Sequence, residues 1–184
     1  MQHPFEKCSA QRARRWFLRL LAGTAVLMAL LTVVGMPLGK IHTASGGRCD
    51  IVSYEIAGTV DRSGAIVTAW KENGVLPYAK WNTWLDYLFL ICYPNAVALG
   101  LIILIARPMS GFWQGLGRIL AWAQWLVLAS DALENAALLH ILYRGVSVPW
   151  PQLALICASV KFTLLAGGLL GLLILFLLAR RSRG

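Results

Sequence analysis

The sequence is poor in charged residues and in cysteine. Charged residues make up 14% of its 184 residues, and only eight of them are acidic, whereas a soluble domain has about 25% charge. Four cysteines are too few for a disulfide-stapled scaffold of this length, and no two of them form a C-x-x-C pair typical of metal or redox sites. The apolar composition is also the reverse of the signature of disorder. These absences exclude an ordinary soluble domain, a disulfide scaffold and a disordered chain.

Common catalytic and binding motifs are missing as well. The sequence has no H-E-x-x-H, no nucleophile elbow and no histidine pair, and its glycines at 111, 115 and 117 lack the lysine of a phosphate-binding loop. No inverted repeat suggests a secondary transporter. The net charge of +9 is accompanied by no basic stripe or nucleic-acid-binding motif. We therefore expect no metal, no cofactor and no nucleic-acid partner, and any enzymatic activity would have to rely on acid–base chemistry.

Long hydrophobic runs are what the sequence does have. Hydrophobic residues make up 58% of the chain, the mean hydropathy is +0.65, and the excess lies in four continuous blocks. Each block is long enough to cross a hydrocarbon layer of about 30 Å as a helix, and none has the period-two alternation of a barrel strand. We therefore predict an all-α fold, a four-transmembrane-helix bundle that forms a single integral membrane domain over residues 1–184. The helices are expected at about residues 16–38, 84–106, 119–143 and 151–179.

Positive charges gather at the edges of these blocks. Basic residues cluster in the two terminal tails, and the loop between the second and third blocks carries Arg107 and Arg118 without an acid. The positive-inside rule then predicts that both termini face the cytoplasm at the inner cell membrane, where the basic edges meet anionic lipids. The first block is longer than the hydrophobic region of a signal peptide, so we expect an uncleaved anchor.

The loop between the first and second blocks, at about residues 39–83, is too long to be structureless in a compact protein. We expect a partly ordered extracytoplasmic loop that acts either as a structural cap or as a substrate gate. Alternation over residues 50–56 predicts a short strand. Thr59 or Asp61 is a suitable cap for a helix over residues 61–72, which Asn73-Gly74 would end.

Side chains of this loop also carry expectations. The predicted helix would place Ala65, Ile66, Ala69 and Trp70 on one apolar face, and Cys49 would be the one thiol exposed outside the membrane. Aromatic side chains are enriched at membrane–water interfaces. The residues expected in this aromatic belt are Trp70, Tyr78, Trp81 and Trp84.

Ionisable residues inside the apolar blocks are the strongest functional signal, because they are costly in a bilayer. In the third block, spacings of seven, three and four put four polar residues on one helical face. The helical rise places Asp131 and Glu134 roughly 18 and 13 Å below the outer end, and Lys161 of the fourth block about 15 Å below it. Opposite charges at one depth predict an ion pair. The candidate site therefore comprises Asp86, Tyr93, Gln124, Asp131, Glu134, Asn135 and Lys161.

Other polar residues help to delimit this site. Asp86 and Tyr93, seven residues apart, share one face of the second block and would line the outer approach to the site. Pro94, directly after Tyr93, frees a backbone carbonyl inside that helix. His140 falls on the opposite face from Asp131 and is expected at the membrane interface.

Several interpretations of this cluster stay open. Two acids three residues apart in a low-dielectric medium do not both ionise easily, so we expect one carboxyl to hold a proton. Such an arrangement suits a site for a small ligand, an ion or a proton, and it equally suits a polar lock that fixes helix packing at ~0.6 kcal/mol per interhelical hydrogen bond. The alternative from another class is an intramembrane acid–base enzyme acting on a lipid or isoprenoid, in analogy to sterol isomerases.

The fourth block also contains a G-x-x-x-G spacing. Gly167 and Gly171 are separated by the four positions that let helices approach closely, within the bundle or between copies. The partners expected are therefore membrane lipids and a membrane protein complex or homo-oligomer formed through these glycines.

Three short motifs carry a resemblance to a known family. They are Asp86-Tyr87-Leu88-Phe89 with Tyr93, Asp131-Ala132-Leu133-Glu134-Asn135, and Ser159-Val160-Lys161-Phe162. Together they resemble the Asp…Phe…Tyr, D-x-x-E-N and single-lysine helices of a widespread family of small bacterial four-helix membrane proteins. The likeness covers the last three blocks and, loosely, the outer loop, although the lysine here precedes Phe162-Thr163 where the family pattern places it after. The resemblance implies the four-helix membrane fold and a cluster that acts as a unit, and it implies no particular activity.

Overall fold

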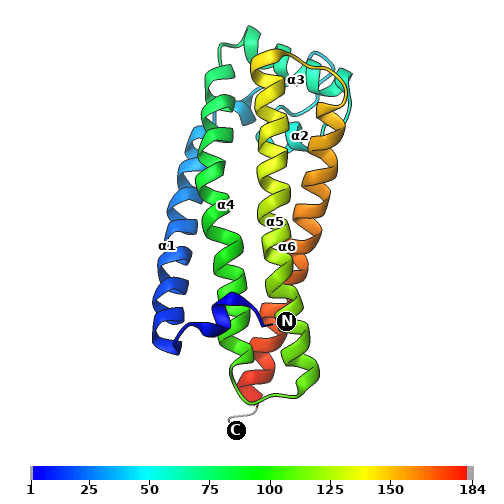
Figure 1. Ribbon diagram of the computed structural model, residues 1–184. Coiled ribbons are helices and arrows are strands. Elements are labelled where there is room, and N and C mark those ends of the chain that lie inside the picture. The colour runs from blue at the N-terminus through cyan, green and yellow to red at the C-terminus, as the bar shows by residue number, and fades with distance from the viewer. Residues whose placement is uncertain (1, 182–184) are drawn as a thin grey trace. The chain divides into compact units, whose positions relative to one another are not determined.

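The computed structural model describes residues 2–181 and shows an all-helical chain in which no described residue belongs to a strand. Within that range four helices are long and apolar enough to span a membrane, as expected of a multi-pass membrane protein (Figure 1). The all-α architecture with four membrane-length helices is therefore confirmed. These helices are α1 (Ala10–Gly35), α4 (Leu76–Ile105), α5 (Gly111–Arg144) and α6 (Trp150–Arg181).

The chain divides into two compact units, and each long helix contributes one stretch to each of them. Unit 1 contains the first and last described residues and the short connection between α4 and α5, whereas unit 2 contains the long connection between α1 and α4. Unit 1 consists of Met1–Thr24, Ile91–Ala129 and Lys161–Gly184, and unit 2 consists of Ala25–Leu90 and Ser130–Val160.

Three of the long helices begin before the apolar blocks that predicted them. α1 begins at Ala10 rather than near residue 16, α4 at Leu76 rather than 84, and α5 at Gly111 rather than 119. Hydropathy identifies only the part of a helix that is apolar, but backbone hydrogen bonding continues into the polar flanks. Arginine is a good helix former, so the basic start of α1 stays helical. Pro77, in the first turn of α4, has a fixed φ that suits a helix start.

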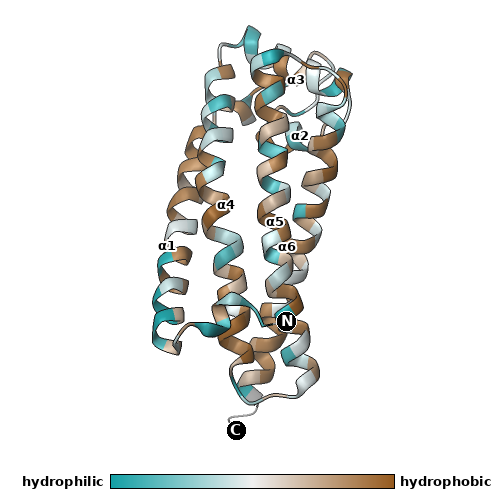
Figure 2. Ribbon diagram, in the orientation of Figure 1, coloured by the Kyte–Doolittle hydropathy of each residue, from teal (hydrophilic) through white to brown (hydrophobic). Residues whose placement is uncertain are grey.

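Large apolar side chains remain exposed along the long helices. On α1 alone, Val26 and Val33 are each 60% exposed and Leu18 is 53% exposed. Figure 2 shows the hydrophobic colour over most of the length of the long helices and hydrophilic positions at the start of α1. Contiguous apolar surface of this kind is unusual for a soluble monomer and suits contact with lipid.

The predicted strand over residues 50–56 is wrong, because this segment forms the short helix α2 (Ile51–Glu55). Asp50 explains the difference, since its Oδ1 accepts a hydrogen bond from the Ser53 backbone N–H at 2.8 Å and so caps the helix. Burial in this segment does not follow the alternation of the sequence. Tyr54 is buried and its hydroxyl donates to the Leu138 carbonyl of α5 at 3.1 Å, whereas Val52, two residues earlier, is exposed.

The predicted helix over residues 61–72 is confirmed as α3 (Val60–Glu72). The Thr59 hydroxyl accepts the Arg62 N–H at 3.2 Å and caps its start. At its end Gly74 adopts a φ of +68°, and the Val75 N–H bonds to the Trp70 carbonyl at 2.9 Å, as in a Schellman motif.

The buried face of α3 differs by one position from the expectation. Ile66, Ala69 and Trp70 are buried as predicted, but Ala65 is exposed and Val67 is buried in its place. Several small or apolar residues follow one another in this part of the sequence. The packing of α3 on the rest of unit 2 determines which of them are buried.

Two further expectations for the outer loop are corrected. Trp70 does not lie in an exposed aromatic belt: it is fully buried, and its Nε1–H donates to the Cys49 carbonyl at 2.8 Å. Cys49 is fully buried too, rather than exposed outside the membrane. The loop shares a core with α4, α5 and α6, in which the Trp70 ring lies 4.9 Å from the Tyr54 ring, centroid to centroid. Burial, together with the nearby Asp50 carboxylate, raises the pKa of the Cys49 thiol.

The remaining aromatic residues near the start of α4 suit a membrane interface. Tyr78, Trp81 and Trp84 are all exposed. His140 is partly buried and stacks on Trp150, with ring centroids 4.1 Å apart.

Candidate functional site

The polar residues singled out in the sequence fall into both units. Asp86, Asp131, Glu134 and Asn135 belong to unit 2, whereas Tyr93, Gln124 and Lys161 belong to unit 1. The predicted pairing of Lys161 with Asp131 or Glu134 joins residues of different units and stays a prediction.

The best-defined polar contact of unit 2 connects α4 with α5. The Asn135 Nδ2 donates to Asp86 Oδ2 at 2.7 Å, and Asn135 is 2% exposed. An amide that donates to a carboxylate stabilises the ionised form of that carboxylate. Asp86 is therefore the acceptor of a short hydrogen bond from α5.

Two more carboxyls lie on the buried face of α5. Asp131 is 1% exposed and Glu134 is fully buried, whereas Leu133, between them in the sequence, is exposed. The spacing of three residues puts both carboxyls on one side of the helix. Unit 2 thus buries two acidic side chains within one turn of α5, next to the residue that bonds Asp86.

Tyr87 also belongs to this cluster, although the sequence analysis did not select it. Its hydroxyl donates to the Ala132 carbonyl of α5 at 3.1 Å, and it lies near Asp131 and Asp86. Its position directly after Asp86 was the feature of the sequence that could have identified Tyr87 as a member of the cluster. Together these residues of unit 2 form the acidic cluster: Asp86, Tyr87, Asp131, Glu134 and Asn135.

Gln124 packs α5 against α6 within unit 1. It is fully buried, and its Nε2 donates to the carbonyls of Leu120 at 3.3 Å and Leu164 at 3.4 Å. A Cβ on Gly168 would collide with the Gln124 amide, so the glycine makes room for it. Leu164 and Gly168 belong to α6, so the spacing of polar residues along α5 does not reveal them as neighbours of Gln124.

The other predicted residues of unit 1 are buried as well. Tyr93 is 7% exposed and Lys161 is 6% exposed. The Lys161 Nζ lies 4.8 Å from the centroid of the Phe162 ring, which is a cation–π distance. α4 remains helical through Pro94, the residue after Tyr93.

The small residues of α6 also serve packing within the chain. A Cβ on Gly171 would collide with the Leu120 side chain of α5, and Gly171 is buried. Gly167 has a looser environment, since the nearest atom to its would-be Cβ is Leu120 Cδ2 at 4.0 Å. Of the two roles that the G-x-x-x-G spacing left open, the structure shows close packing within the chain for Gly171.

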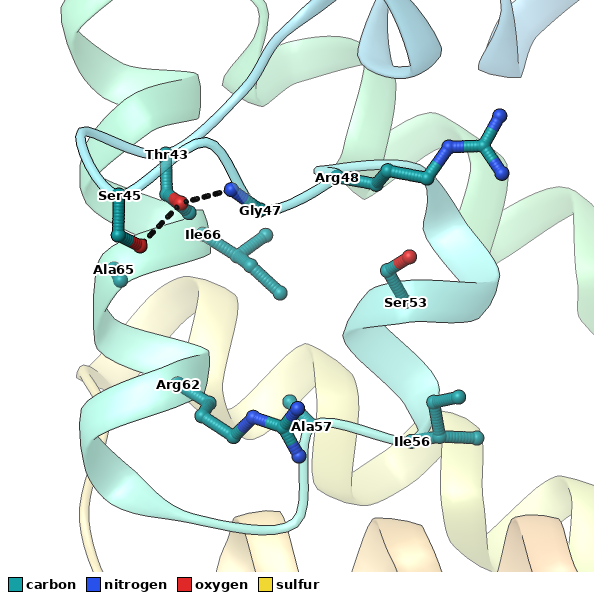
Figure 3. A pocket seen from close by; sticks show the side chains of 10 residues that line it. All are labelled: Thr43, Ser45, Gly47, Arg48, Ser53, Ile56, Ala57, Arg62, Ala65 and Ile66. Atoms are coloured by element: carbon teal, nitrogen blue, oxygen red, sulfur yellow. Dashed lines mark hydrogen bonds between the residues drawn. The ribbon is translucent and has the colours of Figure 1, made fainter.

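A cavity of about 430 Å³ opens in the connection between α1 and α4, in unit 2 (Figure 3). Ile66 projects towards its middle, and Arg62 and Ala57 also line it, whereas the Arg48 guanidinium extends away from the other labelled side chains. Some polar groups that line the cavity bond to one another: the Thr43 hydroxyl accepts the Gly47 N–H at 2.8 Å. The sequence analysis did not predict this cavity.

A polar anchor lies near the start of the chain, in unit 1, and was not predicted from the sequence. Glu6 belongs to the short 3-10 helix η1 (Pro4–Lys7), and its carboxylate forms two bonds with the Arg118 guanidinium of α5, at 2.8 and 3.0 Å. The hydrogen bond from Arg118 is the main reason why the pKa of Glu6 is lowered. The available signal was a single acid in a basic tail, three residues after His3, which is the spacing of a capping box.

His3 completes this anchor. It is fully buried, with its ring 4.9 Å from the rings of both Trp122 and Trp125, centroid to centroid. Burial lowers the pKa of its imidazole, although the Glu6 carboxylate opposes this effect. The Phe5 backbone N–H donates to His3 Nδ1 at 3.3 Å, so Nδ1 is unprotonated in this arrangement.

Neither a metal cluster nor a relative identifies the site. Among residues 2–181, no group of three or more His, Cys, Asp or Glu side chains is arranged to hold a metal ion. Comparison with protein-family models, with curated proteins and with solved structures finds no match for this chain. The proposal below therefore rests on the geometry of α4 and α5 in unit 2.

Proposed function

We propose that this chain is a non-enzymatic multi-pass protein of the inner membrane, whose acidic cluster binds an exchangeable proton or a small cation. The observation that carries the proposal is the burial of Asp131 and Glu134 within one turn of α5, beside the hydrogen-bonded pair of Asp86 and Asn135. Buried carboxyls inside a membrane-length helix are costly, and they mark ion or proton sites by default.

Charge in the cluster argues for an exchangeable proton. Asn135 favours an ionised Asp86, because its amide donates to that carboxylate. Asp131 and Glu134 would add two further negative charges in a low-dielectric environment, where like charges repel strongly. The cluster lowers this cost when one carboxyl takes up a proton or when a cation enters. Both events have the same chemical basis, because each lowers the net negative charge of neighbouring carboxylates.

A polar lock is the second candidate, and a specific observation favours it. The bonds from Asn135 to Asp86 and from Tyr87 to the Ala132 carbonyl both tie α4 to α5. Interhelical hydrogen bonds of this kind are worth about 0.6 kcal/mol each on average, which suffices to fix the register of two helices.

The orientation and the relatives of the chain are part of the proposal. We infer that both termini lie in the cytoplasm, because the basic residues concentrate in the terminal tails and in the connection between α4 and α5. The D-x-x-E-N motif formed by Asp131, Glu134 and Asn135 supports membership of the small bacterial four-helix family described above. A homo-oligomer that uses Gly167 remains part of the same proposal.

Infrared difference spectroscopy of the purified protein in nanodiscs tests the proton site. A protonated carboxyl has its own C=O band, which we expect to titrate with pH in the wild-type protein and to disappear or shift in Glu134→Gln and Asp131→Asn. The matched control is Asp61→Asn, which removes an exposed acid of α3 and should leave the band unchanged. A spectrum without a titrating band, combined with lowered melting temperatures in both cluster variants, would replace the proton site with the lock.

Native mass spectrometry with lipid analysis separates the proton site from the alternative enzyme. Wild type and Glu134→Gln should retain the same lipids if the cluster binds only a proton, because glutamine keeps the shape and loses the titratable group. A specific lipid or isoprenoid retained by the wild type and lost by the variant would contradict the proton site. That outcome would point instead to an intramembrane acid–base enzyme.

A further inference from the structure

A second feature of the molecule, independent of the acidic cluster, is a cavity of about 680 Å³ in unit 1 between α1, α4 and α6. Its volume is within the range of roughly 300–1,000 Å³ that is usual for ligand pockets. The wall is apolar and includes Phe17 of α1, Leu104 of α4 and Leu173 of α6.

A glycine shapes this cavity where the helices approach. A Cβ on Gly100 would lie 3.0 Å from the Leu172 side chain and 3.2 Å from the Phe17 ring. All three residues line the cavity. The absence of a side chain on Gly100 therefore lets α1 and α6 approach α4 while the space beside them stays open.

Two arginines mark one end of the cavity. Arg14 lies near the start of α1, and Arg107 follows the end of α4 by two residues. A third cation is close by, since the Arg180 guanidinium lies 5.7 Å from the ring of Phe176, which is itself part of the wall. The cavity thus has an apolar body and a strongly basic end.

Few acidic side chains are available in unit 1 to balance the charge of this end. The sequence of unit 1 contains a single acid, Glu6, and its carboxylate is bonded to Arg118. Among residues 2–181 no ion pair involves Arg14 or Arg107. Guanidinium groups bind phosphate in bidentate geometry, and basic pockets between membrane helices bind anionic lipid headgroups.

We propose that this cavity binds an anionic phospholipid, with an acyl chain along the apolar wall and the phosphate between Arg14 and Arg107. One charged end and one long apolar body match an amphiphile with a single anionic head. A zwitterionic lipid offers the same chain, but its head carries an added positive charge that the arginines repel.

The test compares phosphatidylglycerol with phosphatidylcholine of the same acyl chains, by native mass spectrometry of the purified full-length protein. We expect phosphatidylglycerol to be retained preferentially. The double variant Arg14→Gln/Arg107→Gln should bind it about 25-fold more weakly, at about fivefold per arginine. The control Arg12→Gln/Arg15→Gln removes two neighbouring exposed arginines of α1 that do not line the cavity, and it should change affinity by much less.

A second variant pair tests the apolar wall. Leu173→Trp fills the cavity from an exposed position and should reduce retention of phosphatidylglycerol with both arginines intact, whereas Leu170→Trp, an exposed residue of α6 outside the wall, should not. Melting temperatures verify that each variant is folded. Equal retention of the two lipids, or equal losses in the test and control variants, would overturn the proposal. A dimer that dissociates in Leu173→Trp without any lipid preference would assign the cavity to a second copy of the chain.

Discussion

At the scale of single residues, polar side chains in this protein act through partners on other helices. The Asn135 amide reaches Asp86 of α4, Gln124 reaches the Leu164 carbonyl of α6, and Tyr54 of α2 reaches the Leu138 carbonyl of α5. The sequence could identify Asn135 and Gln124, because polar residues in apolar helices are rare. Asp86, the partner of Asn135, was already part of the candidate site. The Leu164 carbonyl that Gln124 bonds was not predictable, since a backbone carbonyl leaves no trace in the sequence.

The bond between Asn135 and Asp86 predicts an energetic coupling. In a double-mutant cycle of Asn135→Ala and Asp86→Ala, we expect a coupling of about 0.6 kcal/mol and at most about 1.7 kcal/mol, as found for interhelical bonds in membranes. Unfolding in mixed detergent micelles measures it. The cycle of Asn135→Ala with Asp61→Ala serves as the control and should be additive, because Asp61 is exposed on α3. Additivity in both cycles would contradict the coupling.

The indole of Trp70 predicts a second effect of a single residue. Trp70→Phe keeps most of the apolar packing but removes the donor to the Cys49 carbonyl, which should lower stability by about 1 kcal/mol. Opening of the loop core should then expose the Cys49 thiol, so its labelling by a maleimide should become faster at constant pH. Trp81→Phe, at an exposed position of α4, is the control and should leave the labelling rate unchanged. An unchanged rate in Trp70→Phe would contradict the role of this bond.

At the scale of elements, the sequence predicted those helices that have a long apolar run or clear capping residues. The long helices follow from apolar length, and α3 follows from its caps at Thr59 and Gly74. α2 was mistaken for a strand because alternation over a few residues does not distinguish the two structures. The cap at Asp50 decided the outcome, together with the buried Tyr54.

Gly58, in the connection between α2 and α3, predicts how tightly the outer loop packs on α6. It has a φ of +70°, and a Cβ there would lie 2.6 Å from Leu155 Cδ2. Gly58→Ala should therefore combine backbone strain of about 1–2 kcal/mol with a steric collision. Gly46→Ala is the matched control, because Gly46 also has a positive φ, +82°, but open space around its would-be Cβ. Thermal unfolding should show a larger loss for Gly58→Ala, and equal losses would contradict tight packing.

At the scale of the whole molecule, the proposed orientation is testable by thiol labelling of intact cells. Cys49 is unsuitable as an outer probe because it is buried, so Ala44→Cys, in the exposed part of the loop, replaces it. An impermeant maleimide should label Ala44→Cys and should reach Cys8 only after the cells are permeabilised. Labelling of Cys8 in intact cells would reverse the proposed topology.

The N-terminal anchor of unit 1 predicts that acid releases the first residues from α5. Burial lowers the pKa of His3 below its usual 6.5, so the detached segment takes up a proton more readily than the docked one. Docking should therefore weaken as the pH falls below about 6.5. Protonation also turns Nδ1 from an acceptor into a donor that faces the Phe5 N–H. Glu6 acts in the same direction at lower pH, because its contribution exists above 4.5 and is lost as the pH falls through its lowered pKa.

A fluorescent probe on Cys8 measures this release. The signal should change in two steps as the pH is lowered from 8 to 3, one below 6.5 from His3 and one below 4.5 from Glu6. His3→Gln should remove the first step and keep the second. Glu6→Gln should remove the second step and weaken docking at every pH above it, because it breaks the ion pair with Arg118. A single step that survives in both variants would show that another group controls the docking of this segment.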